Sequence, residues 1–290
     1  MRCSFPIFCL LLITAARPPT AGAFDFDDVR AQAGHLAAQA YRPSTNGVPA
    51  ALTNLSYTEY NALQFIPEKA RWRNEGLPFA LEFFHPGYIH DTAVILHEID
   101  DSSTRVIPFQ QELYNYGSNR VSVPPDLGYA GFRIVRLADN FGEVAVFLGA
   151  SYFRMLGRGQ IFGTSARGLA MGTTNLERPE EFPVFEQFWI RKPRKKDQEI
   201  LVYALMNSPS ITGAYRFAIR PGTATVARVQ AALFPRREVK GFGIAPLTSM
   251  FLHGGSRPMV VPDFRPGFPF PGLPFVLIAQ LLGSAIGKVK

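Results

Sequence analysis

Cysteine is nearly absent from this sequence. Only two of the 290 residues are cysteine, Cys3 and Cys9, and both lie within the first 23 residues. If that segment is removed, no thiol remains for a disulfide, for thiol chemistry or for a cysteine-based metal site. The chain must then be held together by its hydrophobic core alone, which is more typical of a bacterial envelope protein than of a small extracellular module.

Charged residues are also scarce, at 18% of the chain, whereas 47% of the residues are hydrophobic. That balance excludes a disordered chain. The formal net charge is +7, and the one dense basic run is RKPRKK at 191–196. Read as a nucleic-acid patch, the run lacks any recognisable binding module around it. A short run containing proline is common in solvated loops, so we predict a loop between two strands and no nucleic-acid partner.

The sequence lacks a long hydrophobic run at its amino terminus but has a short one. Arg2 precedes an apolar stretch at 3–16, and Ala21-Gly22-Ala23 follows it. This order is that of a secretory signal, and the stretch is too short for a membrane span. We predict a signal peptide at 1–23, a periplasmic mature protein, and no membrane span in the mature domain.

Helical periodicity is confined to the region after the signal. Apolar residues recur at three- and four-residue steps over 26–40, and Ser56 and Glu59 have the spacing of a capping box. From Leu77 onward, short runs rich in Val, Ile, Phe and Tyr alternate with turn residues, as in successive antiparallel strands. We predict strands within 77–84, 91–99, 131–137, 143–156, 182–190, 199–206, 214–220 and 224–234. The fold class is therefore mostly β, a sandwich or barrel with short helices near the amino terminus.

The segment ASYFRMLGRGQIFGTSARGLAMGT, residues 150–173, comes close to two catalytic motifs. A dinucleotide fingerprint that begins at Gly157 and Gly159 needs a third glycine at 162, where the sequence has Phe162. The glycines around Ser165 are one residue too far apart for a nucleophile elbow, and no helix pattern follows. We predict a strand, a hairpin and a second strand, with glycines serving the turns.

Three histidines, His85, His90 and His97, lie close together in the sequence. No acidic pattern beside them completes a zinc site. We predict ordinary hydrogen bonds for these side chains, and neither a metal nor another cofactor.

Aromatic and arginine side chains alternate with apolar residues along the predicted strands. Aromatic rings stack on sugar rings, and arginine donates several hydrogen bonds in a fixed geometry. A sheet face that carries both would suit a glycan groove. The candidate binding residues are Tyr152, Arg154, Arg167, Trp189, Tyr215 and Arg216. Period-two alternation fits a core position equally well, so each of them has burial in the core as its alternative.

Several long blocks resemble one known family. They are LGASYFRMLGRGQIFGTSARGLAMGT, EEFPVFEQFWIRKP, YALMNSPSITGAYRFAIRPG and GIAPLTSMFLHG. These blocks are similar to the periplasmic glucan biosynthesis proteins of the OpgG/OpgD (MdoG) family, and the resemblance covers about 24–266. It implies a galactose-mutarotase-like β-sandwich and a β-1,2-linked glucan as partner. The inner-membrane glucan synthase is a further partner to consider. Some members resemble inverting β-1,2-glucanases, which use two carboxylates.

The sequence departs from the family pattern after Pro266. In place of the family's acidic and tryptophan-rich continuation, 267–290 is an apolar, proline-containing tail. We interpret 24–266 as a truncated domain and the tail as a frameshifted reading or a shortened gene, with a membrane anchor and a buried terminal segment as alternatives. No residue here matches the family's catalytic acid. Enzyme activity is therefore uncertain, and non-catalytic glucan binding is the alternative function.

Overall fold

The computed structural model describes seven stretches of the chain: residues 24–43, 47–101, 103–160, 165–173, 179–239, 241–247 and, for the backbone only, 278–281. The predicted signal peptide and most of the predicted tail lie outside the described residues.

Both predicted helices are present. α1 (Phe26–Ala37) begins with a capping box formed by Asp25 and Asp28, and α3 (Tyr57–Asn61) begins with the one predicted for Ser56 and Glu59. A further short helix, α2, spans Ala50–Thr53, and four 3-10 turns occupy Pro67–Lys69, Arg73–Glu75, Gln111–Leu113 and Ala138–Asn140. Within the described ranges, no helix has the length and hydropathy needed to cross a membrane.

One main sheet has five strands and is antiparallel throughout. Its order is β2-β6-β7-β8-β9. The bounds are Phe79–Phe84, Gly131–Arg136, Gly142–Leu148, Tyr152–Met155 and Ala166–Arg167.

The other main sheet has seven strands, in the order β16-β14-β13-β12-β11-β3-β4. In that order the bounds are Ile278–Leu281, Val226–Pro235, Ile211–Arg220, Ile200–Asn207, Val184–Arg191, Ile95–Ile99 and Thr104–Val106. The expectation of antiparallel neighbours fails at two places, because β3 pairs parallel with β11 and β14 pairs parallel with β16. The first parallel pair arises because the chain builds β6 to β9 of the other sheet before it returns beside β3.

Two small sheets make up the rest of the sheet structure in the described part of the chain. β1 (Gln64–Phe65) pairs with β5 (Tyr114–Asn115), and β10 (Leu169–Met171) pairs with β15 (Phe242–Ile244). The prediction of a mostly β fold with short amino-terminal helices is confirmed, and every run predicted to contain a strand does so.

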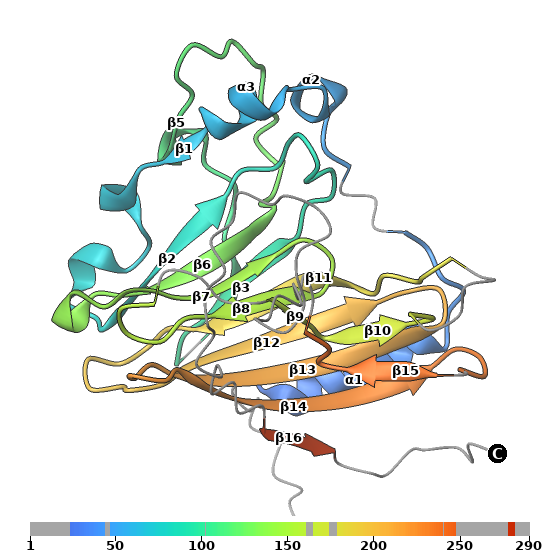
Figure 1. Ribbon diagram of the computed structural model, residues 1–290. Helices are drawn as coiled ribbons and strands as arrows, with labels where there is room; N and C mark the ends of the chain where they lie inside the picture. The colour runs from blue at the N-terminus through green and yellow to red at the C-terminus, as the bar shows by residue number, and fades with distance from the viewer. Residues whose placement is uncertain are drawn as a thin grey trace, which may run out of the picture.

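The two main sheets pack face to face around an aromatic core, as Figure 1 shows. The ring centroids of Phe132 and Phe188 are 5.2 Å apart, and those of Phe147 and Phe217 are 5.1 Å apart, each pair edge to face. Each pair joins one sheet to the other, and such contacts add to the free energy gained from apolar burial. The described strands therefore form a two-layer sandwich.

The outer face of the seven-stranded sheet is partly covered by α1. Val29 and Ala33 are fully buried against Trp189 and Tyr203. The Thr212 hydroxyl donates a hydrogen bond of 2.7 Å to the Ala33 carbonyl oxygen. Figure 1 shows α1 behind β12, β13 and β14. This helix decides which side chains of that outer face reach solvent.

Candidate functional site

Three of the six predicted binding residues lie together on the outer face of the five-stranded sheet. Tyr152 and Arg154 are on β8, and Arg167 is on β9 directly opposite Tyr152. Strand alternation explains the placement, because Phe153 and Met155, which alternate with Tyr152 and Arg154 along β8, point into the core. The side chain of Arg154 is 33% exposed and that of Arg167 is 11% exposed. From here on, the outer face means this outward-pointing side of the five-stranded sheet.

The guanidinium of Arg167 lies against two aromatic rings. Its guanidinium carbon lies 5.7 Å from the centre of the Tyr152 ring and 5.1 Å from that of Phe182. The same guanidinium forms an ion pair with Glu180. Phe182 is 48% exposed, so one side of this stack is open to solvent. Contacts of this kind fix the orientation of the arginine and leave ring surface for a ligand.

A row of alternating charges crosses the outer face beside this stack. Glu82 on β2 accepts a hydrogen bond of 2.6 Å from Nε of Arg133 on β6. Glu143 on β7 lies 3.6 Å from Arg133 and 2.8 Å from Arg154. The row therefore runs from β2 to β8 as acid, base, acid, base. Arginine held in this way presents its remaining N–H groups in a fixed direction.

A hollow of about 200 Å³ opens beside Tyr152. Its polar lining comes from His90, Asp91 and Thr92 in the loop before β3, and the turn between β7 and β8 forms another wall. The turn places Ala150 at φ +34°, a backbone conformation that costs energy for any residue but glycine. Tyr152 lines the hollow from the outer face, and the core residues Phe147 and Phe188 line it as well.

An aromatic cluster continues from the hollow toward α3. The His90 ring lies 5.7 Å from that of Tyr60, Tyr60 lies 6.0 Å from Tyr88, and Tyr88 lies 6.1 Å from Tyr57. Tyr57 is 66% exposed. Burial lowers the pKa of His90 below its usual value and raises the pKa of Tyr60 to about 12. His90 and Tyr60 are therefore uncharged at neutral pH, which favours neutral ligands at this end.

The other three predicted residues lie elsewhere. Trp189 is 3% exposed and sits beneath α1, where the Phe24 ring stacks on it at 5.1 Å. Tyr215 is 2% exposed in the core between the sheets and donates its hydroxyl hydrogen to the Gly168 carbonyl oxygen. Arg216 is half-buried on the outer side of the seven-stranded sheet, opposite Tyr203. None of the three joins the cluster around Tyr152.

Sequence reasoning missed several residues of the outer face. Glu82, Arg133 and Glu143 come from strands that were predicted, but the sequence pattern did not single them out as binding residues. Arg133 alternates with apolar neighbours in GFRIVRL as Arg154 does in SYFRML, so the same signal was available. Glu180 and Phe182 precede β11, and nothing in their local pattern indicates contact with Arg167.

The near matches to catalytic motifs are explained by turns and close packing. The Gly157 carbonyl oxygen accepts a hydrogen bond from the Gln160 backbone N–H, and Gly159 has φ +73°. Both observations confirm a turn. At Gly168 an added Cβ would lie 2.8 Å from the Phe185 ring, so only glycine fits there. Ser165 is followed at once by strand β9 and by no helix. The predicted strand, turn and strand are present, with residues 161–164 outside the described part.

Two of the three histidines, His85 and His97, make the side-chain hydrogen bonds that were predicted. His85 contacts the Pro86 carbonyl oxygen at 2.6 Å and the Tyr116 hydroxyl at 2.9 Å. His97 contacts the Gln187 side chain at 3.2 Å and stacks on Trp189. His90 donates its backbone N–H to the Gly87 carbonyl oxygen.

The fold and the outer face together define a β-sandwich protein with an aromatic and arginine-rich surface. Residues 24–268 match the family model described as "Periplasmic glucan biosynthesis protein, MdoG". The chain belongs to this family, as its sequence motifs predicted.

Curated relatives support the same assignment. The chain is 43% identical to Glucans biosynthesis protein G of Rhodopseudomonas palustris over 267 residues, which are 88% of this chain and 53% of the relative. Identity to the protein of the same name from Ralstonia nicotianae is 45% over 262 residues, or 88% of this chain and 51% of the relative. For Pseudomonas aeruginosa it is 43% over 249 residues, or 84% and 47%. The chain spans about half the length of the curated relatives it matches.

Proposed function

We propose that this chain acts in the biosynthesis of periplasmic glucans by binding a β-1,2-linked glucan in the periplasm. Family membership supports the glucan and the compartment. The β-1,2 linkage follows from the resemblance of the sequence to the family. The binding surface that we propose is the outer face, from the Arg167 stack across to the hollow beside Tyr152.

The observation that carries this proposal is the stack of Tyr152, Arg167 and Phe182. Its rings offer flat apolar surface to the C–H faces of a sugar, and the Arg167 guanidinium lies against both rings. Arg154 and Arg133 add donors for hydroxyl groups along the same face. The hollow of about 200 Å³ next to Tyr152 adds a concave site at one end of this surface.

The carboxylates of the outer face favour binding over hydrolysis. An inverting glycosidase needs one carboxylic acid and one carboxylate base placed on opposite sides of the scissile bond. Here Glu82, Glu143 and Glu180 are each in an ion pair with an arginine. Their arrangement is that of a surface that orients arginines. We therefore propose a non-catalytic role for the described part of the chain.

A glucan-binding protein of this pathway receives its ligand from the enzyme that polymerises it. We propose the inner-membrane glucan synthase as that partner, because the nascent glucan then passes directly to the outer face. The support for this partner is the family's role in biosynthesis.

The test is a titration of the full chain with β-1,2-linked gluco-oligosaccharides, followed by calorimetry, together with a reducing-end assay for hydrolysis. We expect saturable binding without turnover. Arg167→Ala should weaken binding by about tenfold, which corresponds to about 1.4 kcal/mol.

The matched control is Arg120→Ala. Arg120 is exposed, and its side chain donates a hydrogen bond of 3.2 Å to the neighbouring Asn119 carbonyl oxygen. It should bind like the unmodified chain. Absence of binding to any β-1,2-linked oligosaccharide would overturn the proposal, and hydrolysis of the glucan would replace a binding role with a catalytic one.

A further inference from the structure

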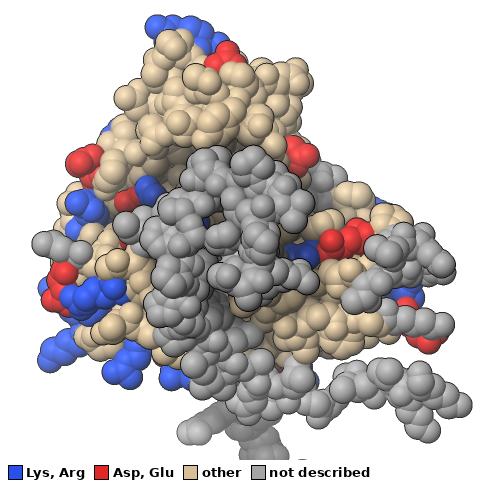
Figure 2. All heavy atoms as spheres, viewed as in Figure 1, with Lys and Arg blue, Asp and Glu red and all other residues tan. Residues whose placement is uncertain are grey.

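A second pocket lies at the end of the seven-stranded sheet where β11 and β13 end and β12 and β14 begin. It is separate from the outer face. Its volume is about 430 Å³. The lining residues come from the end of β11, the loop at 192–199, the start of β12, the end of β13 and the start of β14. Figure 2 shows Lys and Arg side chains gathered at the lower left, the end at which Figure 1 places these turns.

The lining of this pocket carries more positive than negative charge. Four cations, Arg191, Lys192, Arg220 and Arg228, face two carboxylates, Asp197 and Glu199. A surplus of arginine around a concavity attracts anions and concentrates them locally. Which of these cations can bind a ligand depends on whether a carboxylate of the protein already pairs with it.

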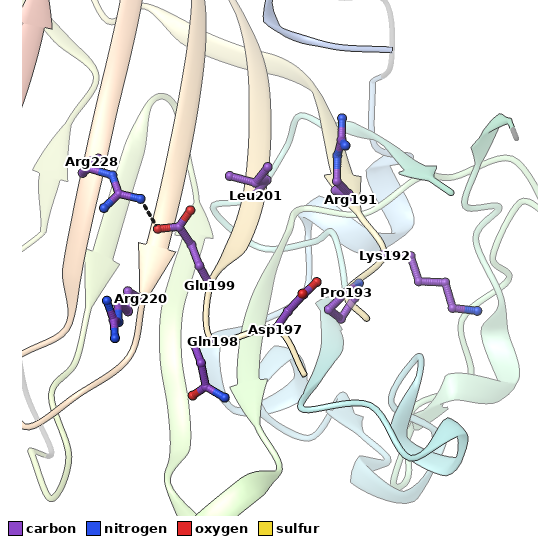
Figure 3. A pocket seen from close by; sticks show the side chains of 9 residues that line it. All are labelled: Arg191, Lys192, Pro193, Asp197, Gln198, Glu199, Leu201, Arg220 and Arg228. Atoms are coloured by element: carbon purple, nitrogen blue, oxygen red, sulfur yellow. Dashed lines mark hydrogen bonds and ion pairs between the residues drawn. The ribbon is translucent and has the colours of Figure 1, made fainter. Parts of the chain in front are cut away.

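Two of the cations are already paired. Arg228 forms an ion pair with Glu199, and Lys192 Nζ lies 2.5 Å from Glu75 Oε2, outside the pocket. Figure 3 shows Glu199 directed toward Arg228 and Lys192 directed away from the other lining residues.

The other two cations have no carboxylate partner among the described residues. Arg191 donates a hydrogen bond of 3.1 Å from Nη2 to the Phe24 carbonyl oxygen, and its Nε is buried without a partner in the same set. Arg220 is exposed at the end of β13 and forms no ion pair with a described residue. Asp197 forms no ion pair with either arginine among the described residues, and its side chain accepts the Arg194 backbone N–H within its own turn.

The floor between these arginines is apolar and small. Leu201 on β12 lies opposite Ala218 on β13, which lies opposite Arg228 on β14. Residues paired in this way share one face of the sheet. Figure 3 shows Leu201 between Arg191 on one side and Arg220 and Arg228 on the other. A ligand resting on Leu201 thus has a guanidinium on each flank.

We propose that this pocket binds an oxyanion-bearing ligand, a phosphate or a carboxylate, with Arg220 and Arg191 as its principal donors. Guanidinium groups match the oxygen geometry of both ions and donate two hydrogen bonds at once. Glu199 competes with the ligand for Arg228. The basic run at 191–196, a loop between β11 and β12 as predicted, contributes one side of this pocket.

The experiment measures binding of inorganic phosphate, and separately of citrate, to the full chain by calorimetry at constant ionic strength set with chloride. We expect saturable binding of at least one of the two anions, and the comparison decides between a phosphate and a carboxylate ligand. Arg220→Gln should weaken binding by about tenfold or more, the size expected for a charge-assisted hydrogen bond. Arg120→Gln, an exposed arginine outside the pocket, should leave the affinity unchanged.

A second variant makes the test independent of loss of function. Glu199→Gln removes the internal partner of Arg228, so it should tighten anion binding severalfold. Thermal unfolding without ligand checks that both variants are folded. The proposal is overturned if neither anion binds above the chloride background, or if Arg220→Gln binds as well as the unmodified chain. It is also overturned if Glu199→Gln weakens binding in a folded protein.

Discussion

The two main sheets bury similar aromatic cores but differ on the faces that point away from each other. The five-stranded sheet leaves Tyr152, Arg154 and Arg167 partly exposed, and ion pairs hold the two arginines. The seven-stranded sheet has comparable side chains, yet α1 covers Trp189 and Tyr203. The comparison teaches that residue type and alternation assign a side chain to a face, whereas a helix from elsewhere in the chain decides whether that face can bind anything.

The largest effect on stability should come from removing the side chain that packs beneath α1. We expect Trp189→Ala to lower the free energy of unfolding by about 3–5 kcal/mol, because it leaves a cavity beneath α1 and removes the stack with Phe24. Urea unfolding followed by circular dichroism measures the change. Glucan affinity per folded molecule should stay unchanged. A variant of normal stability with weaker glucan binding would place Trp189 in the binding surface instead.

The next largest effect is the pH dependence of stability that the buried side chain of His85 should cause. Burial, opposed only in part by the Pro86 carbonyl contact, lowers the pKa of His85 to about 4. The usual pKa near 6.5 applies to the unfolded chain. Between these values the unfolded state binds a proton that the folded state does not. The stability contributed by His85 is therefore complete above about pH 6.5 and is lost as the pH falls toward 4, by about 3 kcal/mol in all.

The measurement is the free energy of unfolding at a series of pH values between 7 and 4, for the unmodified chain and for His85→Gln. Carboxylates and the other histidines titrate in both proteins, so the difference between the two curves isolates His85. The gap between them should narrow as the pH falls. Parallel curves would show that His85 takes up its proton equally well in the folded chain.

Sequence reasoning reached the strands more reliably than the site, and the reason is physical. The Phe, Val and Ile runs encode strand and core together, so β6, β7, β12 and β13 follow from local pattern. The parallel pairing of β3 with β11 does not, because Gln187 and Ile95 are distant in sequence and no local signal fixes their register. For the same reason Trp189 was taken for a groove residue: its covering ring, Phe24, lies far away in the sequence.

A smaller effect, on glucan affinity, should separate one arginine on the outer face from one on the outward side of the seven-stranded sheet. We expect Arg154→Gln to weaken glucan binding by about fivefold to tenfold, since it removes a donor that Glu143 holds in place. Arg216→Gln should leave binding unchanged, because Arg216 lies on the other sheet beside Tyr203. Calorimetric titrations with the same oligosaccharide measure both. Equal losses in the two variants would mean that the glucan does not distinguish the faces.

The smallest effect tests how firmly α1 is held over its sheet. The Asp25 side chain accepts the Asp27 backbone N–H at 2.8 Å, and the Asp28 side chain accepts the Asp25 backbone N–H at 2.7 Å. Asp25→Ala removes the first of these bonds and should cost about 1 kcal/mol of stability. In a Trp72→Phe background only Trp189 remains as a tryptophan, so quenching of its fluorescence by acrylamide reports its exposure directly. Quenching should rise slightly with Asp25→Ala and not with the exposed-charge control Asp126→Ala. If Asp25→Ala changes neither the stability nor the quenching, the packing of Val29 and Ala33 alone holds the helix. The covered face then owes its burial to side chains within α1 rather than to the capped start of the helix.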